Sequence, residues 1–270
     1  EVVWVGGKQE GGKLGDLFAF KQDHIFKDWD DVKANANNRY DAIGELYGPA
    51  AWEALKDKAG KQPIEPGDVC WADLNNDGVI NNLDRVKVGN LFPTVTGGFS
   101  TTLGYKDFSL YARFDYALGH TLYNDLAARS LGQYQGSFNI IDMVKDSWSE
   151  TNQNTDIPKF YYADQLSKKN ITRSNNGLTA VDNNSSRFYE KGDYLALREI
   201  TLTWNLPKKW INKALMSNAS VYVTGQNLFY ITGYTGVSPE PAVDTTYGQG
   251  LDNGRYPTPK TVLLGLSVTF

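Results

Sequence analysis

The sequence predicts an all-β fold made of antiparallel strands that cross a membrane. Three observations predict this fold. First, the second half of the chain alternates apolar and polar residues with period two, which is typical of strands with one apolar face. Second, the regular runs extend for roughly 9–11 residues, the length of tilted strands that cross a bilayer, whereas strands of soluble sheets average about 5–6. Third, short and long connections between the runs alternate strictly, as they do in transmembrane barrels.

Composition excludes several other classes of protein. With 41% hydrophobic and 13% aromatic residues, the chain is too apolar to be disordered. With a net charge of −4, the chain lacks the excess of basic residues that nucleic-acid binders carry, so we expect no nucleic-acid partner. The single cysteine, Cys70, cannot form an internal disulfide, and two histidines are too few and too far apart for a histidine-based metal site. No apolar run approaches the roughly 18 residues of a membrane helix.

The predicted strands begin with a hairpin. Residues 95–105 place Val95, Phe99 and Leu103 on one face, and after the turn Lys106-Asp107 the alternation continues from Phe108 to Tyr116. Three further strands are expected over 199–206, 219–230 and 261–270. Arg198 falls on the apolar face of its run, so we expect it above the apolar band or beside a bulge. Aromatic residues near the strand ends suit the girdles of a membrane barrel: Tyr105, Tyr116, Trp204, Tyr230 and Phe270.

Connection lengths indicate which ends of the strands share a side. Lys106-Asp107 and the 207–218 segment are short and are expected at the periplasmic rim with Phe270, whereas 119–187 and 232–259 are long and are expected outside. Helical spacing predicts short helices within the loops, over 140–148 and 50–58. The alternative is a soluble β-sandwich whose aromatic residues form an ordinary core.

One motif has the spacing of a calcium loop. Residues 73–84 read D-x-N-x-D-G and end in Asp rather than Glu at position twelve, and Gly78 allows the sharp turn. Hard oxygen donors at this spacing favour Ca²⁺ with a structural role, and Ile80 is expected to anchor the loop in a core. An Asx-rich turn without metal is the alternative. The expected ligands are Asp73, Asn75, Asp77, the carbonyl of Val79, and Asp84.

No enzyme signature is found. The sequence lacks the G-x-S-x-G, H-E-x-x-H and phosphate-loop motifs. The carboxylates Asp142, Asp146 and Glu150 are explained more simply as a solvated helix face than as an acid/base pair. We therefore expect no enzymatic activity.

Several motifs of this chain, and their order along it, resemble those of SusC/RagA-type TonB-dependent outer-membrane transporters. The segment P-G-D-V at 66–69, the loop D-L-N-N-D-G-V-I-N at 73–81, Asp84-Arg85 and Gly89-Asn90 look like the hallmark of that family. Residues 15–26, 154–159, 221–229 and 257–270 are similar to its flanking stretches, so the likeness covers nearly the whole chain.

The resemblance implies a 22-stranded barrel with an N-terminal plug, of which this chain would be the last third. Members of the family import oligosaccharides or oligopeptides across the outer membrane of Gram-negative bacteria. A SusD-like surface lipoprotein caps the barrel, and TonB pulls on an N-terminal box. Neither plug nor box is found here, so we expect TonB to act through a part of the transporter outside this sequence.

We accordingly expect residues 1–94 to form an extracellular loop region with the calcium loop, and residues 95–270 to form C-terminal barrel strands with their loops. Five or six strands cannot close into a barrel, so the first and last strands should pair with polypeptide outside this chain. The competing function is that of a soluble, calcium-stapled glycan-binding β-domain. Loop aromatics are candidate substrate contacts, although loop packing also explains them: Tyr134, Phe138, Tyr161, Tyr162 and Tyr247.

Overall fold

The computed structural model describes residues 4–5, 8–9, 11–35, 40–41, 65–80, 82–128, 130–131, 142–160, 170, 185–240, 250–252, 254 and 256–270. The chain divides into two compact units, each treated separately below. The first unit comprises Glu1–Leu91, Thr121–Glu190 and Ala242–Gly254, and the second comprises Phe92–His120, Lys191–Pro241 and Arg255–Phe270. The sequence-based division between residues 94 and 95 stays a prediction.

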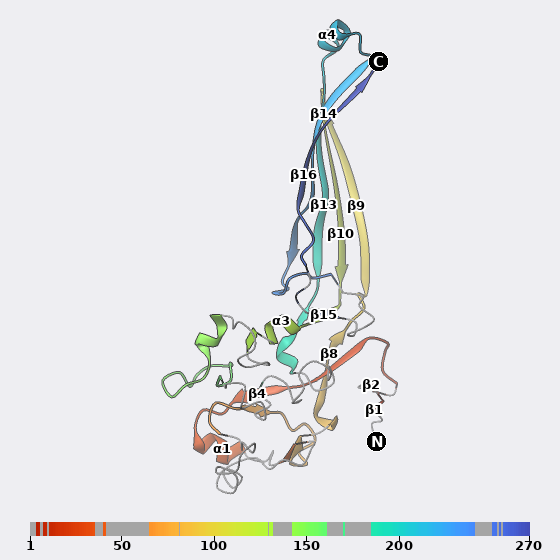
Figure 1. Cartoon of the computed structure of the whole chain (residues 1–270). Coiled ribbons are helices and arrows are strands. Elements are labelled where there is room, and N and C mark those ends of the chain that lie inside the picture. Colours follow the sequence, from red (N-terminus) through yellow and green to blue (C-terminus); the bar gives the residue numbers. More distant parts are fainter. Residues whose placement is uncertain are drawn as a thin grey trace. The chain divides into compact units, whose positions relative to one another are not determined.

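The second unit is built on one five-stranded antiparallel sheet, in which the long strands run side by side (Figure 1). Their order is β16-β14-β13-β10-β9, so in the described part of the chain β9 and β16 each have one partner. The predicted all-β, antiparallel class is confirmed. The strands are β9 (Val95–Tyr105), β10 (Phe108–Leu118), β13 (Tyr194–Asn205), β14 (Asn218–Thr232) and β16 (Thr261–Thr269).

One face of this sheet carries a continuous apolar row. Pairing between neighbouring strands aligns Leu103, Leu110, Leu202, Val223 and Leu264 across all five strands. These side chains are not gathered into a core, because Leu202 is 48% exposed and Leu264 is 77% exposed. A soluble sandwich would bury such a row against a second sheet. The exposure therefore favours a sheet whose apolar face meets lipid.

The opposite face is lined by small and polar side chains. The neighbouring row aligns Thr102, Tyr111, Thr201, Thr224 and Leu263, and the hydroxyl oxygens of Thr201 and Thr224 lie 2.8 Å apart in a hydrogen bond. Moving one position along each strand therefore changes an apolar row into a largely polar one.

Arg198 lies in a β-bulge, as the sequence suggested. Its neighbours Leu197 and Glu199 pair with successive residues of β10, so Arg198 is the extra residue. The bulge turns its guanidinium to the polar face, where it pairs with Asp115 and Glu240 and donates to the Tyr230 hydroxyl at 3.1 Å. Strict alternation would place the charge of Arg198 toward lipid, and the bulge moves it to the polar face of the sheet instead.

Aromatic residues gather where the strands end near the Lys106-Asp107 turn. Phe108 stacks on Trp204 with ring centroids 6.0 Å apart, and Trp204 meets Trp210 of α4 (Lys208–Ile211) edge to face at 5.8 Å. Figure 1 shows α4 at this end of the strands together with the C-terminus. The connection continues through η7 (Asn212–Ala214). Tyr230 also lies near a strand end, but its contacts with Arg198 place it on the polar face rather than in an aromatic girdle.

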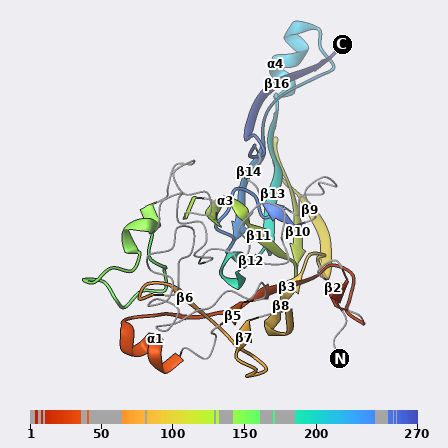
Figure 2. The same ribbon diagram turned by 60° about the horizontal axis from the view of Figure 1, so that its bottom comes forward.

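The first unit consists of short elements, labelled in Figures 1 and 2. β3 pairs with β8, β4 with β6 and β5 with β7, while β11 lies between β12 and β15. No helix in the described residues is long and apolar enough to cross a bilayer. The strands are β1 (Trp4–Val5), β2 (Lys8–Gln9), β3 (Asp16–Phe20), β4 (Gln22–Ile25), β5 (Tyr40–Asp41), β6 (Val69–Trp71), β7 (Val79–Ile80), β8 (Arg85–Asn90), β11 (Thr121–Asn124), β12 (Tyr189–Lys191) and β15 (Leu251–Asp252). The helices are α1 (Trp29–Asn35), η1 (Asn82–Asp84), α3 (Asp125–Ala128), η3 (Asp142–Asp146) and η6 (Ser186–Phe188).

A small apolar core holds four of these strands together. It joins residues from β3, β4, β6 and β7 to Trp148, and its members are Phe20, Ile25, Val69, Trp71, Ile80 and Trp148. The helix expected over 140–148 is the short 3₁₀ helix η3, and the indole of Trp148 beyond it donates to the Lys27 carbonyl at 3.2 Å. The helix expected over 50–58 lies outside the described residues.

We predict that Leu264→Arg will impair assembly of the protein in a bilayer, whereas Leu263→Arg will be tolerated. The two leucines are adjacent in β16 but lie on opposite faces. An arginine facing lipid near the bilayer midplane costs about 2–4 kcal/mol, and one facing the barrel interior avoids that cost. The folded fraction in outer-membrane preparations, measured by heat-modifiable mobility on gels, checks this. Equal loss in both variants would contradict the assignment of faces.

Candidate calcium loop

The loop with calcium-binding spacing connects two elements of the first unit. It leaves β6 at Trp71 and returns through β7 and η1. Ile80, in β7, is fully buried in the apolar core, so the anchoring role expected from the sequence is confirmed. Positive φ angles of 58° at Asn76 and 79° at Gly78 produce the tight turn between the ligand positions.

Hydrogen bonds to the backbone hold three of the expected ligand side chains in place within this loop. The carboxylate of Asp73 accepts from the Gly78 N–H at 2.8 Å, and the Asn75 side-chain oxygen accepts from the Asp77 N–H at 3.1 Å. Asp84, fully buried, accepts from the Leu74 N–H at 2.8 Å and so closes the loop from its far end. Of the expected ligand Val79, the structure describes only the backbone, in β7.

One oxygen in this loop is buried without a partner. Oδ1 of Asp73 has no hydrogen-bond donor, although the other oxygen of the same carboxylate is bonded. A buried carboxylate oxygen that lacks a partner is costly unless a cation or water meets it. The donors at these positions are all oxygens, the ligand type that Ca²⁺ prefers. The residues present therefore fit a calcium ion.

The five loop aromatics proposed as substrate contacts, at positions 134, 138, 161, 162 and 247, are outside the described residues. Arg187 contacts both the carbonyl oxygen and the carboxylate of Asp156.

The polar face of the five-stranded sheet carries a further arrangement that the sequence did not reveal. A hollow of about 430 Å³ is lined by Arg113, Asp115 and Arg198 together with Gly98, Ser100 and two phenylalanines. Glu240, in the segment after β14, is tied to this surface through Arg198 and through the Tyr230 hydroxyl, which donates to it at 2.6 Å. Glu240 and Asp115 are distant in sequence, and only the bulge in β13 brings Arg198 between them.

Several known proteins are similar to this chain. TonB-dependent receptor P3 of Formosa agariphila is 32% identical over 243 residues, covering 85% of this chain. TonB-dependent receptor SusC of Bacteroides thetaiotaomicron is 25% identical over 265 residues, covering 97% of it. Among solved structures, that of the RagAB peptide transporter superposes on 76% of this chain with a TM-score of 0.59 at 24% identity, which supports the barrel fold.

The chain belongs to the SusC-like TonB-dependent receptors. It spans about a fifth of the length of the relatives it matches, 22% of receptor P3 and 23% of SusC. A scan against models of protein families finds no match. The relatives are named as receptors and transporters, which agrees with the expectation that this SusC-like chain is not an enzyme.

For the calcium loop of this SusC-like chain, we predict that Asp77→Ala will lower calcium content and loosen the 73–84 segment while leaving the barrel strands intact. The substitution removes a carboxylate at the third ligand position. Asn76→Gly is the matched control, because it keeps the positive φ and changes a residue that is not an expected ligand. Calcium measured by elemental analysis of the purified protein checks this, and unchanged content in Asp77→Ala would refute the site.

Proposed function

We propose that this chain forms part of the wall and outer loops of a TonB-dependent importer in the outer membrane of a Gram-negative bacterium. One observation carries the proposal: a chain from the SusC-like receptors has an apolar row across five long strands. Leu110 of this row is half-buried, and the members on the other four strands are exposed. Exposed apolar area on this scale is unfavourable in water, at about 25 cal/mol per Å², and favourable against lipid tails.

The remaining barrel strands and the plug are the first expected partners. β9 and β16 end the described sheet, and an unpaired strand edge within hydrocarbon leaves each backbone group unsatisfied. We therefore expect β9 and β16 to pair with strands of the same transporter that lie outside this sequence. Coupling to TonB would occur through that part as well.

A SusD-like surface lipoprotein is the proposed lid, and oligosaccharides or oligopeptides are the proposed cargo. Support for the lid is the family itself and the fold shared with the RagAB peptide transporter. The polar face of the sheet, with Arg113, Asp115 and Arg198, would line the passage. The first unit, with its calcium loop, would contribute to the surface that meets cargo or lid, and the ion would hold the loop in shape.

The competing hypothesis of a soluble, calcium-stapled glycan-binding domain has less support. Such a domain would need to bury the apolar row, yet Leu103 is 61% exposed and Leu264 77% exposed. A calcium loop would suit a soluble glycan-binding domain as well as it suits a transporter, so the loop does not distinguish the two functions.

Cell fractionation and uptake together test the proposed function. We expect the full-length protein in the outer-membrane fraction, extractable only with detergent. We also expect a deletion strain to lose uptake of labelled oligosaccharides or oligopeptides too large for porins, with uptake restored by the wild-type gene and abolished when TonB is inactivated. Recovery of the protein in the soluble fraction, or TonB-independent uptake, would contradict the proposal.

A further inference from the structure

A second cluster of metal-ligating side chains lies in the first unit, apart from the calcium loop. Asp23 and His24 are on β4, and Cys70 is on the neighbouring strand β6, where it pairs directly with His24. One potential ligand atom from each of these three residues lies within 4.8 Å of the other two. The cluster combines a carboxylate oxygen, an imidazole nitrogen and a thiol sulfur, a donor set typical of zinc.

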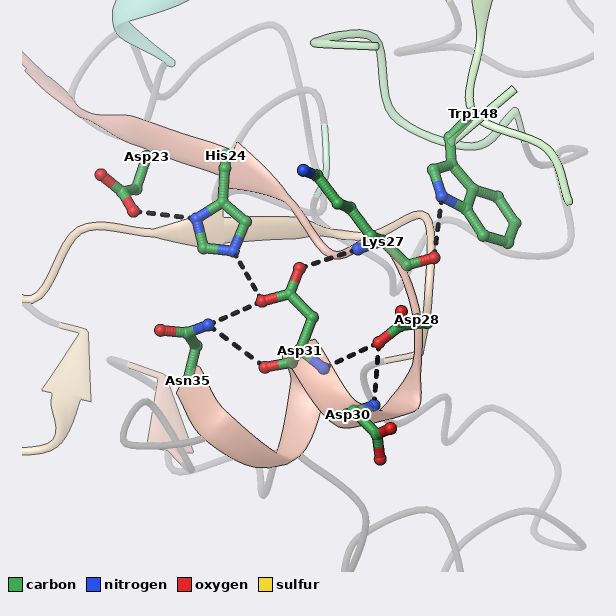
Figure 3. A network of polar contacts seen from close by, with 8 residues as sticks. All are labelled: Asp23, His24, Lys27, Asp28, Asp30, Asp31, Asn35 and Trp148. Atoms are coloured by element: carbon green, nitrogen blue, oxygen red, sulfur yellow. Dashed lines mark hydrogen bonds and ion pairs between the residues drawn. The ribbon is translucent and has the colours of Figure 1, made fainter. Parts of the chain in front are cut away.

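The imidazole of His24 is held between two carboxylates (Figure 3). Its Nδ1 lies 2.8 Å from Asp23 Oδ2, and its Nε2 lies 3.3 Å from Asp31 Oδ1 on α1. A neutral imidazole has a single N–H to donate. That N–H can serve only one of the two carboxylates, so the other ring nitrogen can offer its lone pair to a metal ion.

Hydrogen bonds hold the Asp31 carboxylate in place beside the imidazole of His24. Asp31 accepts from the Lys27 N–H at 2.9 Å and from the Asn35 side chain at 2.6 Å. Burial by itself raises the pKa of Asp31, but these hydrogen bonds and the nearby His24 outweigh it, so the pKa is lowered and the group stays ionised. A fixed carboxylate that accepts from the far nitrogen of a histidine is the arrangement that orients metal-bound imidazoles. The metal would therefore lie on the Asp23 side.

Cys70 supplies the third ligand atom of the cluster from the buried side. The side chain is 6% exposed and packs against Phe26 and Val32. Without a metal, burial first and then Asp23 and Asp31 raise the pKa of this thiol to about 12, so it is protonated at neutral pH. A divalent ion beside the sulfur removes that proton and offsets the charge of the neighbouring carboxylates.

We propose that Asp23, His24 and Cys70 bind one Zn²⁺ ion, with Asp31 as a positioning residue behind the imidazole. Tetrahedral bonds of about 2.0–2.3 Å place ligand atoms roughly 3.5 Å apart. Binding of the ion would therefore widen the 2.8 Å contact between Asp23 and His24 and bring any ligand atoms that lie farther apart, up to 4.8 Å, closer together. Cys70 closes the site on the buried side. Because the Asp23 side chain is 56% exposed, the fourth position opens to water. The ion would join β4 to β6, and the inference does not depend on the proposed transport function.

Cobalt substitution tests the site in the full-length protein purified in detergent. The protein is stripped with chelator, saturated with Ca²⁺ so that the calcium loop does not take up cobalt, and titrated with Co²⁺. We expect thiolate-to-cobalt charge-transfer absorption that saturates at one equivalent and is displaced by Zn²⁺. Cys70→Ser and Cys70→Ala should abolish this absorption. Asp77→Ala, in the calcium loop, should retain it.

The positioning role of Asp31 has its own readout. Asp31→Asn should keep the charge-transfer absorption but weaken cobalt binding about 10–100-fold. Asp30→Asn, one residue earlier on the same helix, is the matched control and should bind as the wild type does. Equal weakening in the two variants would overturn this role.

Two results would overturn the zinc site. One is the absence of a cobalt–sulfur band in folded wild-type protein, which would leave Cys70 as a buried apolar residue. The other is a band that persists in Cys70→Ser. Should both Cys70 variants fail to assemble, X-ray absorption at the zinc edge of the wild type decides the question: a sulfur ligand at about 2.3 Å is expected, and a shell of only nitrogen and oxygen would refute the site.

Discussion

Lipid places two demands on every long strand of this chain. First, lipid tails offer no hydrogen bonds to the backbone, so each strand needs a neighbouring strand on both sides. Second, lipid tails accept only apolar side chains, so every second residue of a strand must be apolar. The aligned row from Leu103 to Leu264 meets the second demand across five strands. The first demand, at β9 and β16, requires the rest of the barrel.

Arg198 shows how the chain reconciles this demand with a charged residue in a strand. A strict alternation would direct its guanidinium to the apolar side. The bulge adds one residue, turns the side chain to the polar face, and lets it join β10, β14 and the segment that carries Glu240. Charge in the wall is thus paired and kept away from lipid, which is how ionisable groups are tolerated at membrane depth.

The strands were predictable from the sequence because period two over long runs is a local pattern. The tight turn and the buried Ile80 of the 73–84 loop were predictable for the same reason, whereas its calcium ion stays a prediction. The contacts of Arg198 were not predictable beyond a bulge, because Asp115 and Glu240 reach it only through strand pairing. The cluster of Asp23, His24 and Cys70 was missed for the same reason: the pairing of β4 with β6 places His24 beside a distant cysteine.

A spin-label scan along β16 would establish what the apolar face touches. Nitroxides are placed singly at positions 261 to 268 of the full-length protein in outer membranes, and their collisions with oxygen and with a water-soluble nickel complex are measured. We expect period two, with positions 262, 264, 266 and 268 accessible to oxygen from the lipid and the positions between them accessible to nickel. Protection of the even positions from both reagents would place these side chains in a dry protein core and contradict the membrane assignment.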